Sequence, residues 1–332
     1  MMDTDVAQTD RVARGNLLRD RLRTQGVDVR PVPRLTGSTP SDLQWAISEA
    51  RSPMLFAGLI DAWPAVRNWT PEKLAKDHGD KRVTALMGLP TSGVLYPGDQ
   101  HDYEKKLTFG KFLEEMLQEA PKLPCYLAHV RVEDILPPED YDFRALLNPD
   151  QEAVDTRAWI GSAGTRSMLH SDLNDNLFVQ IWGEKEVVLI PWDQTPAAYP
   201  FPDNIVNSSL DLADVDLRKN PLLKEAVLYG TTVRPGDVLF VPRGCWHDFR
   251  ALAPSVSVNH WFGPPMPFQE YAMQLLKLGP THWAAAARDF VKHGVLEQPE
   301  PMKFFFSPSS TGKRLYDLVR RGDFSHGNSD IK

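Results

Sequence analysis

Hydrophobic and polar positions alternate along several short stretches in the middle of the chain. The segments at 126–132 and 255–262 show this alternation clearly. A period of two is typical of a β-strand with one buried face, because successive side chains of a strand point to opposite sides of the sheet. We therefore expect Tyr126, Ala128 and Val130 to share one face of a strand.

Two mostly apolar stretches lie close together farther along the chain. Residues 177–182 and 185–190 are separated only by Gly183 and Glu184, and a short glycine-containing turn between apolar runs predicts a β-hairpin. Short strands separated by turn signals continue from about residue 80 to residue 262. This spacing predicts a β-sandwich or barrel.

Helical patterns flank the β-rich region on both sides. Thr39, Thr70 and Thr108 each have the character of a helix N-cap, and the first two are followed by proline. The helix after Thr108 is expected to carry an apolar face made of Phe109, Phe112, Leu113, Met116 and Leu117. Three more helices are expected beyond Pro264, at 268–278, 282–293 and 312–321. The expected fold class is therefore mainly β with flanking helices.

Changes in composition divide the chain into three parts. Residues 1–35 are charged, with a helical pattern near 12–22, and are predicted to form a loosely attached N-terminal arm. Residues 36–264 contain a helical N-terminal cover and the β-rich core, and residues 265–332 form a helical tail. A segment rich in Pro, Asn and Asp at 193–232 has the length of a functional loop or lid.

The composition is that of an ordinary globular protein. The chain has 332 residues, of which 42% are hydrophobic and 24% charged, and its formal net charge of −7 argues against a nucleic-acid partner. Only Cys125 and Cys245 are present, so no disulfide framework is expected and a reducing compartment is favoured. Neither a signal peptide nor a membrane-spanning run is recognisable. We therefore expect a soluble, cytoplasmic protein.

Three side chains have the pattern of a metal site. His170 and Asp172 lie two residues apart at the predicted end of a strand, so their side chains point to the same side. His247 comes 77 residues after His170 and follows an apolar run bounded by Gly236 and Pro242, the pattern of a buried strand ending in a turn. If the two strands are neighbours, two imidazoles and one carboxylate meet. This set suits Fe(II) with positions left open for a co-substrate and O2.

These motifs resemble the JmjC-type, cupin-like 2-oxoglutarate oxygenases, and among them the asparaginyl hydroxylase of hypoxia-inducible factor. Looser support comes from the segments at 54–64, 69–72, 79–80, 207–211 and 259–262. The resemblance covers most of the chain. It implies a double-stranded β-helix, or jelly-roll, core that binds Fe(II) through His170, Asp172 and His247 and takes 2-oxoglutarate and O2 as co-substrates.

The resemblance also implies the residues that bind 2-oxoglutarate. Lys185 would bind the distal carboxylate, assisted by the hydroxyl of Ser167 and by Tyr126, while Asn176 and Asn259 would touch the other end of the co-substrate. The residues alone leave other interpretations open. Lys185 could be an exposed hairpin lysine, Tyr126 a packed strand aromatic, and the two asparagines strand-edge or turn amides.

Other histidines and the second cysteine receive less weight. His129 and His260 are the ones expected to line the pocket, whereas the remaining histidines have no partner at a ligand spacing. Cys245 lies two residues before His247 and stays open as an additional ligand.

The expected reaction is hydroxylation of a C–H bond of a protein or peptide side chain, with succinate and CO2 as by-products. The same chemistry on a small molecule, a free amino acid or a tRNA base is an alternative, although the net negative charge weighs against tRNA. Demethylation of N-methyl-lysine is accessible to such a site, but no chromatin-reader module or zinc cluster is recognisable. The intact triad with Lys185 weighs against a non-catalytic cupin module or an isomerase.

Substrate contacts and oligomeric state are less directly encoded. Substrate contacts are expected in the segments at 88–107, 133–142 and 193–232, and acidic residues at 133–142 would favour a basic substrate. In related hydroxylases the helices that follow the barrel form a homodimer. A homodimer through residues 265–332 is expected on that resemblance.

Overall fold

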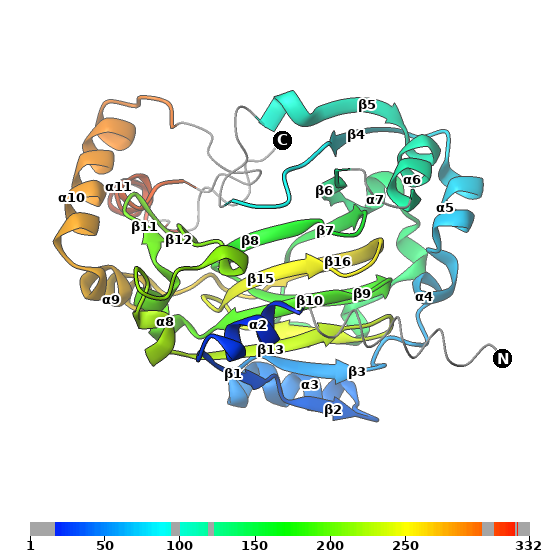
Figure 1. Cartoon of the computed structure of the whole chain (residues 1–332), viewed down its shortest axis with the longest axis horizontal. Coiled ribbons are helices and arrows are strands. Elements are labelled where there is room, and N and C mark those ends of the chain that lie inside the picture. The colour runs from blue at the N-terminus through cyan, green and yellow to red at the C-terminus, as the bar shows by residue number, and fades with distance from the viewer. Residues whose placement is uncertain (1–16, 94–99, 119–122, 301–308, 323, 325–332) are drawn as a thin grey trace.

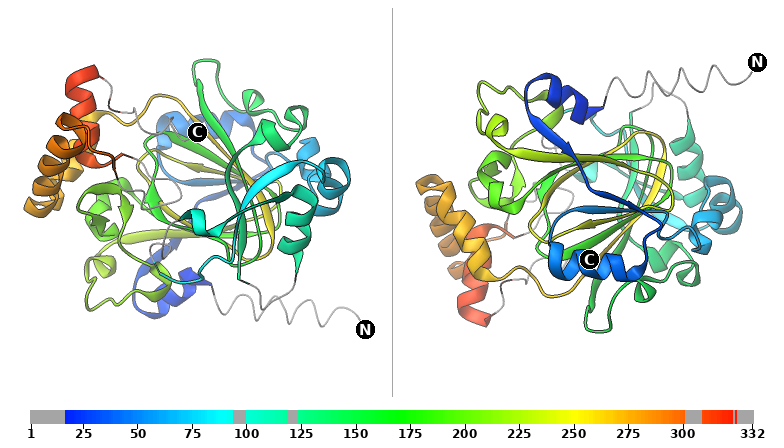
Figure 2. Two further views of the ribbon diagram at one scale, coloured as in Figure 1. Left: turned by 90° about the horizontal axis from the view of Figure 1, so that it is seen from above. Right: turned by 90° about the horizontal axis from the view of Figure 1, so that it is seen from below.

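The computed structural model describes residues 17–93, 100–118, 123–300, 309–322 and 324. Two β-sheets face each other, and helices cover the outer surfaces of this sandwich (Figure 1; Figure 2). The expected fold class, a β core with flanking helices, is confirmed. Among the described residues, no helix is both long enough and apolar enough to cross a membrane.

One sheet has seven strands. Their order across the sheet is β1 (Asp28–Pro31), β13 (Val227–Val233), β10 (Lys185–Ile190), β15 (Trp246–Ala251), β8 (Arg166–Ser171), β12 (Asn204–Ser208) and β11 (Pro200–Phe201).

The other sheet has nine strands. Their order is β2 (Arg34–Thr36), β3 (Met54–Ala57), β14 (Val238–Val241), β9 (Asp175–Trp182), β16 (Ser255–Phe262), β7 (Ala153–Gly161), β6 (Cys125–Arg131), β4 (Arg82–Met87) and β5 (Glu104–Thr108).

The chain passes repeatedly from one sheet to the other, as a double-stranded β-helix requires. Strands β8, β10, β13 and β15 lie in the seven-stranded sheet, whereas β9, β14 and β16 lie in the nine-stranded sheet. The predicted hairpin of 177–182 with 185–190 is therefore wrong, because β9 and β10 belong to different sheets. Gly183, at φ 71°, turns so closely against the carbonyl of Pro254 that a Cβ there would lie 2.1 Å from its oxygen. The apolar pattern of a strand that is buried on both faces does not indicate which strand it pairs with, so the sequence could not reveal this separation.

Helices of the N-terminal half cover the outer face of the nine-stranded sheet. They are α3 (Pro40–Trp45), α4 (Pro64–Asn68), α5 (Pro71–His78), α6 (Phe109–Leu117) and α7 (Val132–Ile135). The N-caps predicted at Thr70 and Thr108 are confirmed, because their hydroxyls accept bonds from the third amide of each helix over 3.4 and 3.3 Å. At α3 the residue at the N-cap position is Thr39, and Asp42 Oδ2 accepts from its amide over 2.7 Å and from its hydroxyl over 2.8 Å. Leu117 is exposed, so the apolar face of α6 contains four of the five expected residues.

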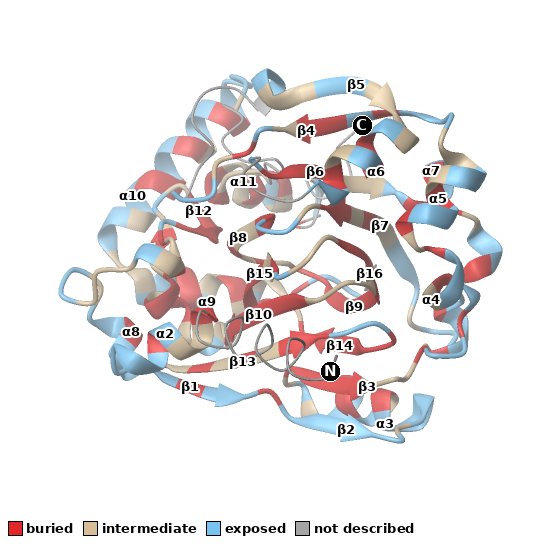
Figure 3. Ribbon diagram, turned by 45° about the vertical axis from the view of Figure 1, so that its right-hand side comes forward, coloured by how far each residue is buried: buried red, intermediate tan, exposed pale blue. Residues whose placement is uncertain are grey.

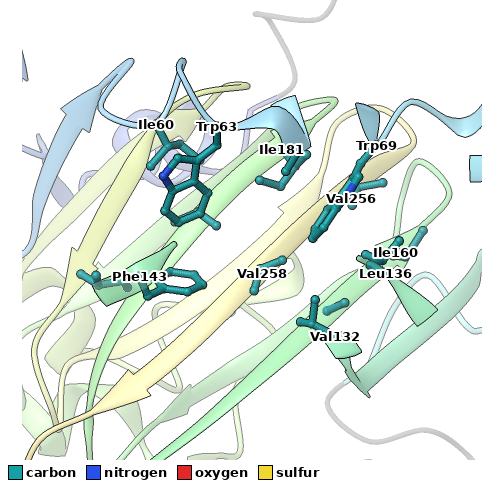
Figure 4. Close-up of a cluster of buried hydrophobic side chains, with 14 of the residues drawn as sticks. Ile60, Trp63, Trp69, Val132, Leu136, Phe143, Ile160, Ile181, Val256 and Val258 are labelled. Carbon is teal, nitrogen blue, oxygen red and sulfur yellow. The ribbon is translucent and has the colours of Figure 1, made fainter. Parts of the chain in front are cut away.

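A large apolar cluster fills the space between these helices and the sheet. Figure 4 shows Trp63, Trp69 and Phe143 of the cover lying against Val256 and Val258 of β16. Figure 3 shows that burial runs along the central strands while the outer helix faces are exposed. The cluster makes β16 a fixed platform whose opposite face looks into the space between the sheets.

A second cluster lies between the two sheets. Val187 and Leu189 of β10 meet Leu239 and Val241 of β14 there, with Phe249 of β15 at the border. This cluster fills part of the sandwich interior with hydrocarbon. Polar side chains therefore gather in the remaining part, which holds the candidate site described below.

The N-terminal segment differs from the expected loose arm. From residue 17 onward it packs on the sandwich: Leu18 and Leu22 of α2 (Leu18–Thr24) are buried, and β1 pairs in parallel with β13. The amide of Leu18 donates to Glu186 Oε2 over 2.8 Å. Residues 12–16 of the predicted helix at 12–22 lie outside the described residues.

Two further segments differ from their sequence pattern, one by containing regular structure and one by containing a bulge. The role of residues 193–232 as a functional loop or lid stays a prediction. The segment at 193–232 contains β12, which pairs with β8, the short helix α8 (Leu222–Glu225) and the start of β13. In β6, His129 adopts φ 59° and the register with β7 shifts. Val130 therefore packs in the apolar cluster between the helices and the nine-stranded sheet, whereas Tyr126 and Ala128 pack in a different cluster, so the three do not share one face as expected.

The three helices expected after Pro264 are confirmed. They are α9 (Phe268–Leu278), α10 (Pro280–Asp289), which continues as a π-helical turn at Phe290–Val295, and α11 (Thr311–Arg321). Figure 2 shows them grouped on one side of the sandwich. Tyr271 and Leu275 of α9 pack against Leu173, which directly follows Asp172. The division into domains at residue 264 is not tested and stays a prediction.

Candidate metal centre

The residues expected to bind a metal converge between the sheets. His170 is the fifth residue of β8, Asp172 follows the end of that strand, and His247 is the second residue of β15. Strands β8 and β15 are antiparallel neighbours, with His170 directly opposite His247. One possible ligand atom from each of the three residues lies within 4.8 Å of the other two. A metal ion held by three ligands at about 2 Å requires such a separation.

Backbone carbonyls orient both imidazoles. His170 Nδ1 is 2.7 Å from the carbonyl oxygen of Met168, and His247 Nδ1 is 2.9 Å from that of Cys245. A neutral ring that donates from Nδ1 presents the lone pair of Nε2. The Nε2 atoms of His170 and His247 are 3.9 and 3.5 Å from the nearer oxygens of Asp172, so both lone pairs face the carboxylate. Burial, followed by the neighbouring His170, lowers the pKa of His247 to about 4, which keeps it neutral.

A tight turn immediately before β15 contacts the segment that carries Asp172. The apolar run before His247 forms β14, a buried strand that ends in a turn as expected. This strand lies in the nine-stranded sheet, and the chain crosses at residues 242–245 to begin β15, which carries His247. In this crossing the amide of Gly244 donates to the carbonyl of Asp172 over 2.7 Å. Gly244 has φ 80°, and a Cβ there would lie 2.4 Å from Met266 Cε. The crossing thus fixes Asp172 and His247 together.

Lys185 lies in the same interior, at the start of β10. Its side chain is 2% exposed, and Nζ donates to Ser257 Oγ over 2.7 Å. The ring centroids of Tyr126 and Phe178 are 5.7 and 5.5 Å from Nζ. Burial lowers the pKa of Lys185 to about 7, and no carboxylate among the described residues pairs with it. The exposed-hairpin interpretation is therefore excluded, and a buried ammonium of this kind requires an anionic partner.

Other residues predicted for the co-substrate are distributed unevenly. Ser167, Tyr126 and Asn259 line the same cavity as the triad and Lys185. The hydroxyl of Ser167 accepts the amide of Phe249 over 3.3 Å. Asn176 is fully buried and does not line the cavity; its Nδ2 is 3.4 Å from Asp172 Oδ2. Contact of these four residues with 2-oxoglutarate stays a prediction.

Several cavity residues were not identified from the sequence. Trp261 lines the cavity and donates from Nε1 to Asp172 Oδ2 over 2.7 Å, and Ser257 is the hydroxyl partner of Lys185. Both lie two residues from Asn259 on β16, so strict alternation along that strand would have found them. The aromatic walls Trp159, Phe178 and Phe249 come from three other strands. No local signal distinguishes their inward faces.

Of the three remaining candidates, His129 lies next to the cavity, whereas His260 and Cys245 lie elsewhere. The imidazole of His129 lies 5.9 Å from the ring of Trp261, and burial lowers its pKa to about 4. His260 does not line the pocket; its ring stacks on Phe143, 4.2 Å away, on the opposite face of β16. Cys245 is not in the group that could hold a metal, and its thiol points to the carbonyl of Ile190 at 3.6 Å. Because Cys245 precedes β15, strand alternation does not apply to it.

The donor set fits the metal that the sequence predicted. Two imidazoles and one carboxylate on one side of a site leave coordination positions open, which suits non-haem Fe(II). Lys185, buried and without a carboxylate partner in the part of the chain that the structure describes, fits an anionic co-substrate beside it.

Comparison with known proteins agrees with this geometry. Residues 40–268 match a family model described as a cupin-like domain. Similar proteins include lysine-specific demethylase 8 of Xenopus tropicalis, 29% identical over 64% of this chain and 48% of that protein. Jumonji C domain-containing protein 5 of Drosophila melanogaster is 29% identical over 70% of this chain and 59% of that protein. HSPB1-associated protein 1 of Rattus norvegicus is 26% identical over 69% and 52%, respectively. The chain thus spans about half the length of the curated relatives it matches.

Proposed function

Because this chain belongs to the cupin-like, JmjC-type domain family, we propose that it is an oxygenase dependent on Fe(II) and 2-oxoglutarate. The observation that carries the proposal is the joint placement of three metal-ligating side chains and a buried lysine in one cavity. Fe(II) and 2-oxoglutarate would supply the oxidising chemistry when bound. The protein would supply binding, orientation and exclusion of water.

Each cavity residue has a role that its position supports. His170, Asp172 and His247 would bind the iron through one side of its coordination shell. Lys185, hydrogen-bonded to Ser257, would neutralise the distal carboxylate of 2-oxoglutarate. Trp159, Phe178 and Phe249 form apolar walls that would keep water from the reacting atoms.

We propose hydroxylation of a protein or peptide side chain as the reaction. Demethylation of N-methyl-lysine is the second candidate, and the names of two relatives, lysine-specific demethylase 8 and lysine-specific demethylase JMJ30 of Arabidopsis thaliana, favour it. Both begin with oxidation of a C–H bond. They differ in the product, since oxidation of an N-methyl carbon releases formaldehyde whereas hydroxylation leaves one oxygen atom on the substrate.

The proposed basic substrate loses part of its support. Of the five acids in residues 133–142, Glu133 pairs with a neighbouring arginine, Asp140 accepts a bond from Trp69 Nε1 over 2.8 Å, and Asp142 caps a short helix. Two acids are left without such a structural role. Replacing the acids of this segment by amides with no change in substrate affinity would eliminate this idea.

The first experiment is an anaerobic titration of the protein with Fe(II) and 2-oxoglutarate, which follows the visible charge-transfer band between iron and the oxoacid. We expect a band that Asp172→Ala abolishes and Lys185→Ala weakens. Folded protein without a band would contradict the proposal and favour a binding module or isomerase. Incubating the active protein with candidate peptides, with formaldehyde and added oxygen measured in parallel, then separates demethylation from hydroxylation.

A further inference from the structure

The two oxygens of the Asp172 carboxylate have different surroundings. Oδ2 accepts a hydrogen bond from Trp261 Nε1 over 2.7 Å and lies 3.4 Å from Asn176 Nδ2. Among the described residues, none donates a hydrogen bond to Oδ1. A carboxylate that is free to rotate can bind a metal through either oxygen or through both. Because hydrogen-bond donors contact only Oδ2, the two carboxylate oxygens of Asp172 are no longer equivalent as possible metal ligands.

The indole of Trp261 is itself held in place. Trp261 lies on β16 between β7 and β9, where its backbone pairs with Asp155 on one side and Asn176 on the other. Its ring lies 5.9 Å from the ring of His129, which is 5.7 Å from the ring of Trp159. His129 reaches this position because the bulge in β6 gives it φ 59°. Backbone strain of this kind often occurs beside functional sites.

We propose that Trp261 is a positioning residue which, with Asn176, directs Oδ1 of Asp172 to the metal. This inference rests on the proposed function. Hydrogen bonds to Oδ2 restrain the carboxylate to one rotamer and oppose its binding through both oxygens. A carboxylate that contributes a single oxygen leaves more of the coordination shell open to 2-oxoglutarate and O2.

The test uses Co(II) alone as a probe for the metal, so it requires neither 2-oxoglutarate nor turnover. Metal-free wild-type protein and Trp261→Phe are titrated with Co(II), and its visible absorption is followed. Loss of a group that orients a metal ligand typically weakens metal binding by about 10- to 100-fold. We expect that loss for Trp261→Phe, together with a changed Co(II) spectrum because the carboxylate is released.

Trp159→Phe is the matched control. Trp159 also lines the cavity and also packs on His129, but its indole nitrogen has no hydrogen-bond partner among the described residues. We expect its Co(II) affinity and spectrum to equal those of the wild type. Equal affinities for Trp261→Phe and wild type, or equal losses in both variants, would overturn the proposal.

The outcomes separate this inference from the proposed function. A wild-type protein that binds Co(II), but gives no charge-transfer band with Fe(II) and 2-oxoglutarate, would contradict the proposed function while the two variants still decide the role of Trp261. A wild-type protein that does not bind Co(II) would overturn both.

A second measurement covers the case in which Trp261→Phe does not fold. Wild-type protein carrying ¹⁵N-labelled tryptophan, of which the chain has nine, is titrated with Zn(II), and the indole N–H resonances are followed. We expect one slowly exchanging, downfield resonance to move in proportion to bound Zn(II), because its proton is bonded to a metal ligand. Absence of such a resonance would overturn the proposal.

Discussion

At the scale of single residues, Lys185 is a fully buried amine whose charged form is disfavoured by burial. Its pKa is lowered to about 7 by burial, whereas an unfolded lysine titrates near 10.5. Between these values the unfolded state binds a proton that the folded state has released, so the stability of the ligand-free protein should rise with pH across this range. An anion bound beside Lys185 would offset the cost. Lys185 therefore lowers the stability of the ligand-free protein and favours the binding of an anion.

This charge predicts a pH dependence of 2-oxoglutarate binding. The dianion should bind the protonated form of Lys185, so the apparent Kd should be lowest below pH 7 and rise about tenfold per pH unit above it. Isothermal titration calorimetry of the protein loaded with a redox-inert metal, from pH 6 to 9, measures this. Lys185→Met should bind weakly with a flat profile. A wild-type profile that is equally flat would show that the lysine charge is not used.

At the scale of elements, turns that cross between the sheets place the functional side chains. Gly183 carries the chain from β9 to β10, and the crossing at 242–245 carries it from β14 to β15. Each crossing sets which face of the next strand looks inward, because strand side chains alternate. Lys185 and His247 owe their inward positions to these turns.

Substitution of Gly183 should be costly for two separable reasons. A Cβ at φ 71° is strained, and it would lie 2.1 Å from the carbonyl oxygen of Pro254. Gly263 has φ 70° with no atom within 4 Å of such a Cβ, so Gly263→Ala isolates the backbone cost of about 1 kcal/mol. We expect Gly183→Ala to lower the free energy of unfolding by roughly 3 kcal/mol, measured by urea denaturation. Equal losses in the two variants would mean that the contact with Pro254 relaxes freely.

An ionic network joins the outer faces of β8 and β15, the strands that carry His170 and His247. Asp211 accepts bonds from Arg166 of β8 over 3.0 Å and from Arg250 of β15 over 3.1 Å. The same carboxylate accepts the amide of Gly93, at 2.9 Å, in the loop after β4. Burial acts to raise the pKa of Asp211, but its hydrogen bonds and the two guanidinium groups bring the net shift below the usual value. The network therefore holds β8, β15 and that loop together.

Asp211→Asn should destabilise the fold strongly, because it leaves the buried guanidinium of Arg166 without its counter-ion and leaves Arg250 with Asp248 alone. Breaking a buried pair costs about 3–5 kcal/mol, and urea unfolding at pH 7 measures it. Asp216→Asn, which removes one exposed pair with Arg218, is the control and should have a much smaller effect. The stability difference between wild type and Asp211→Asn should shrink as pH falls through the lowered pKa of Asp211. A difference that does not depend on pH would refute the role assigned to its charge.

At the scale of the whole molecule, the parts outside the sandwich are integrated with the site. The N-terminal segment extends the seven-stranded sheet through β1, and the C-terminal helices pack on Leu173 beside Asp172 of the proposed metal site. The C-terminal helices also expose apolar side chains, among them Met273, Leu276, Val295 and Leu296. Exposed apolar groups of this kind are typical of interaction surfaces.

The homodimer expected from the resemblance stays a prediction, and these helices provide its test. Leu276 and Val295 are 64% and 54% exposed. Light scattering after size-exclusion chromatography should give twice the chain mass for wild type and a monomer for Leu276→Glu combined with Val295→Glu, since a buried charge opposes association. Leu252→Glu alters an exposed leucine on the β15–β16 turn and should leave the mass unchanged. A monomeric wild type would exclude the dimer.

The sequence by itself predicted the type of most elements and the three candidate metal ligands. Helix caps at Thr70 and Thr108, and the alternation along β16, are local signals that depend on neighbouring residues only. His170 and Asp172 are likewise related through strand geometry. His247 was inferred as their partner from the apolar run before it, on the condition that the two strands are neighbours. The likeness to a known family added the role of Lys185.

Only the tertiary structure decided which strands pair and which faces turn inward. It separated β9 from β10, set His247 opposite His170 across 77 residues of sequence, and brought Trp261 to Asp172. A strand buried on both faces has the same apolar pattern whichever strand it pairs with. A β-bulge such as that at His129 reverses the alternation of side chains, and no residue type in the sequence marks its position. Local periodicity therefore fixes the type of element. The choice of partner depends on packing between segments distant in the chain.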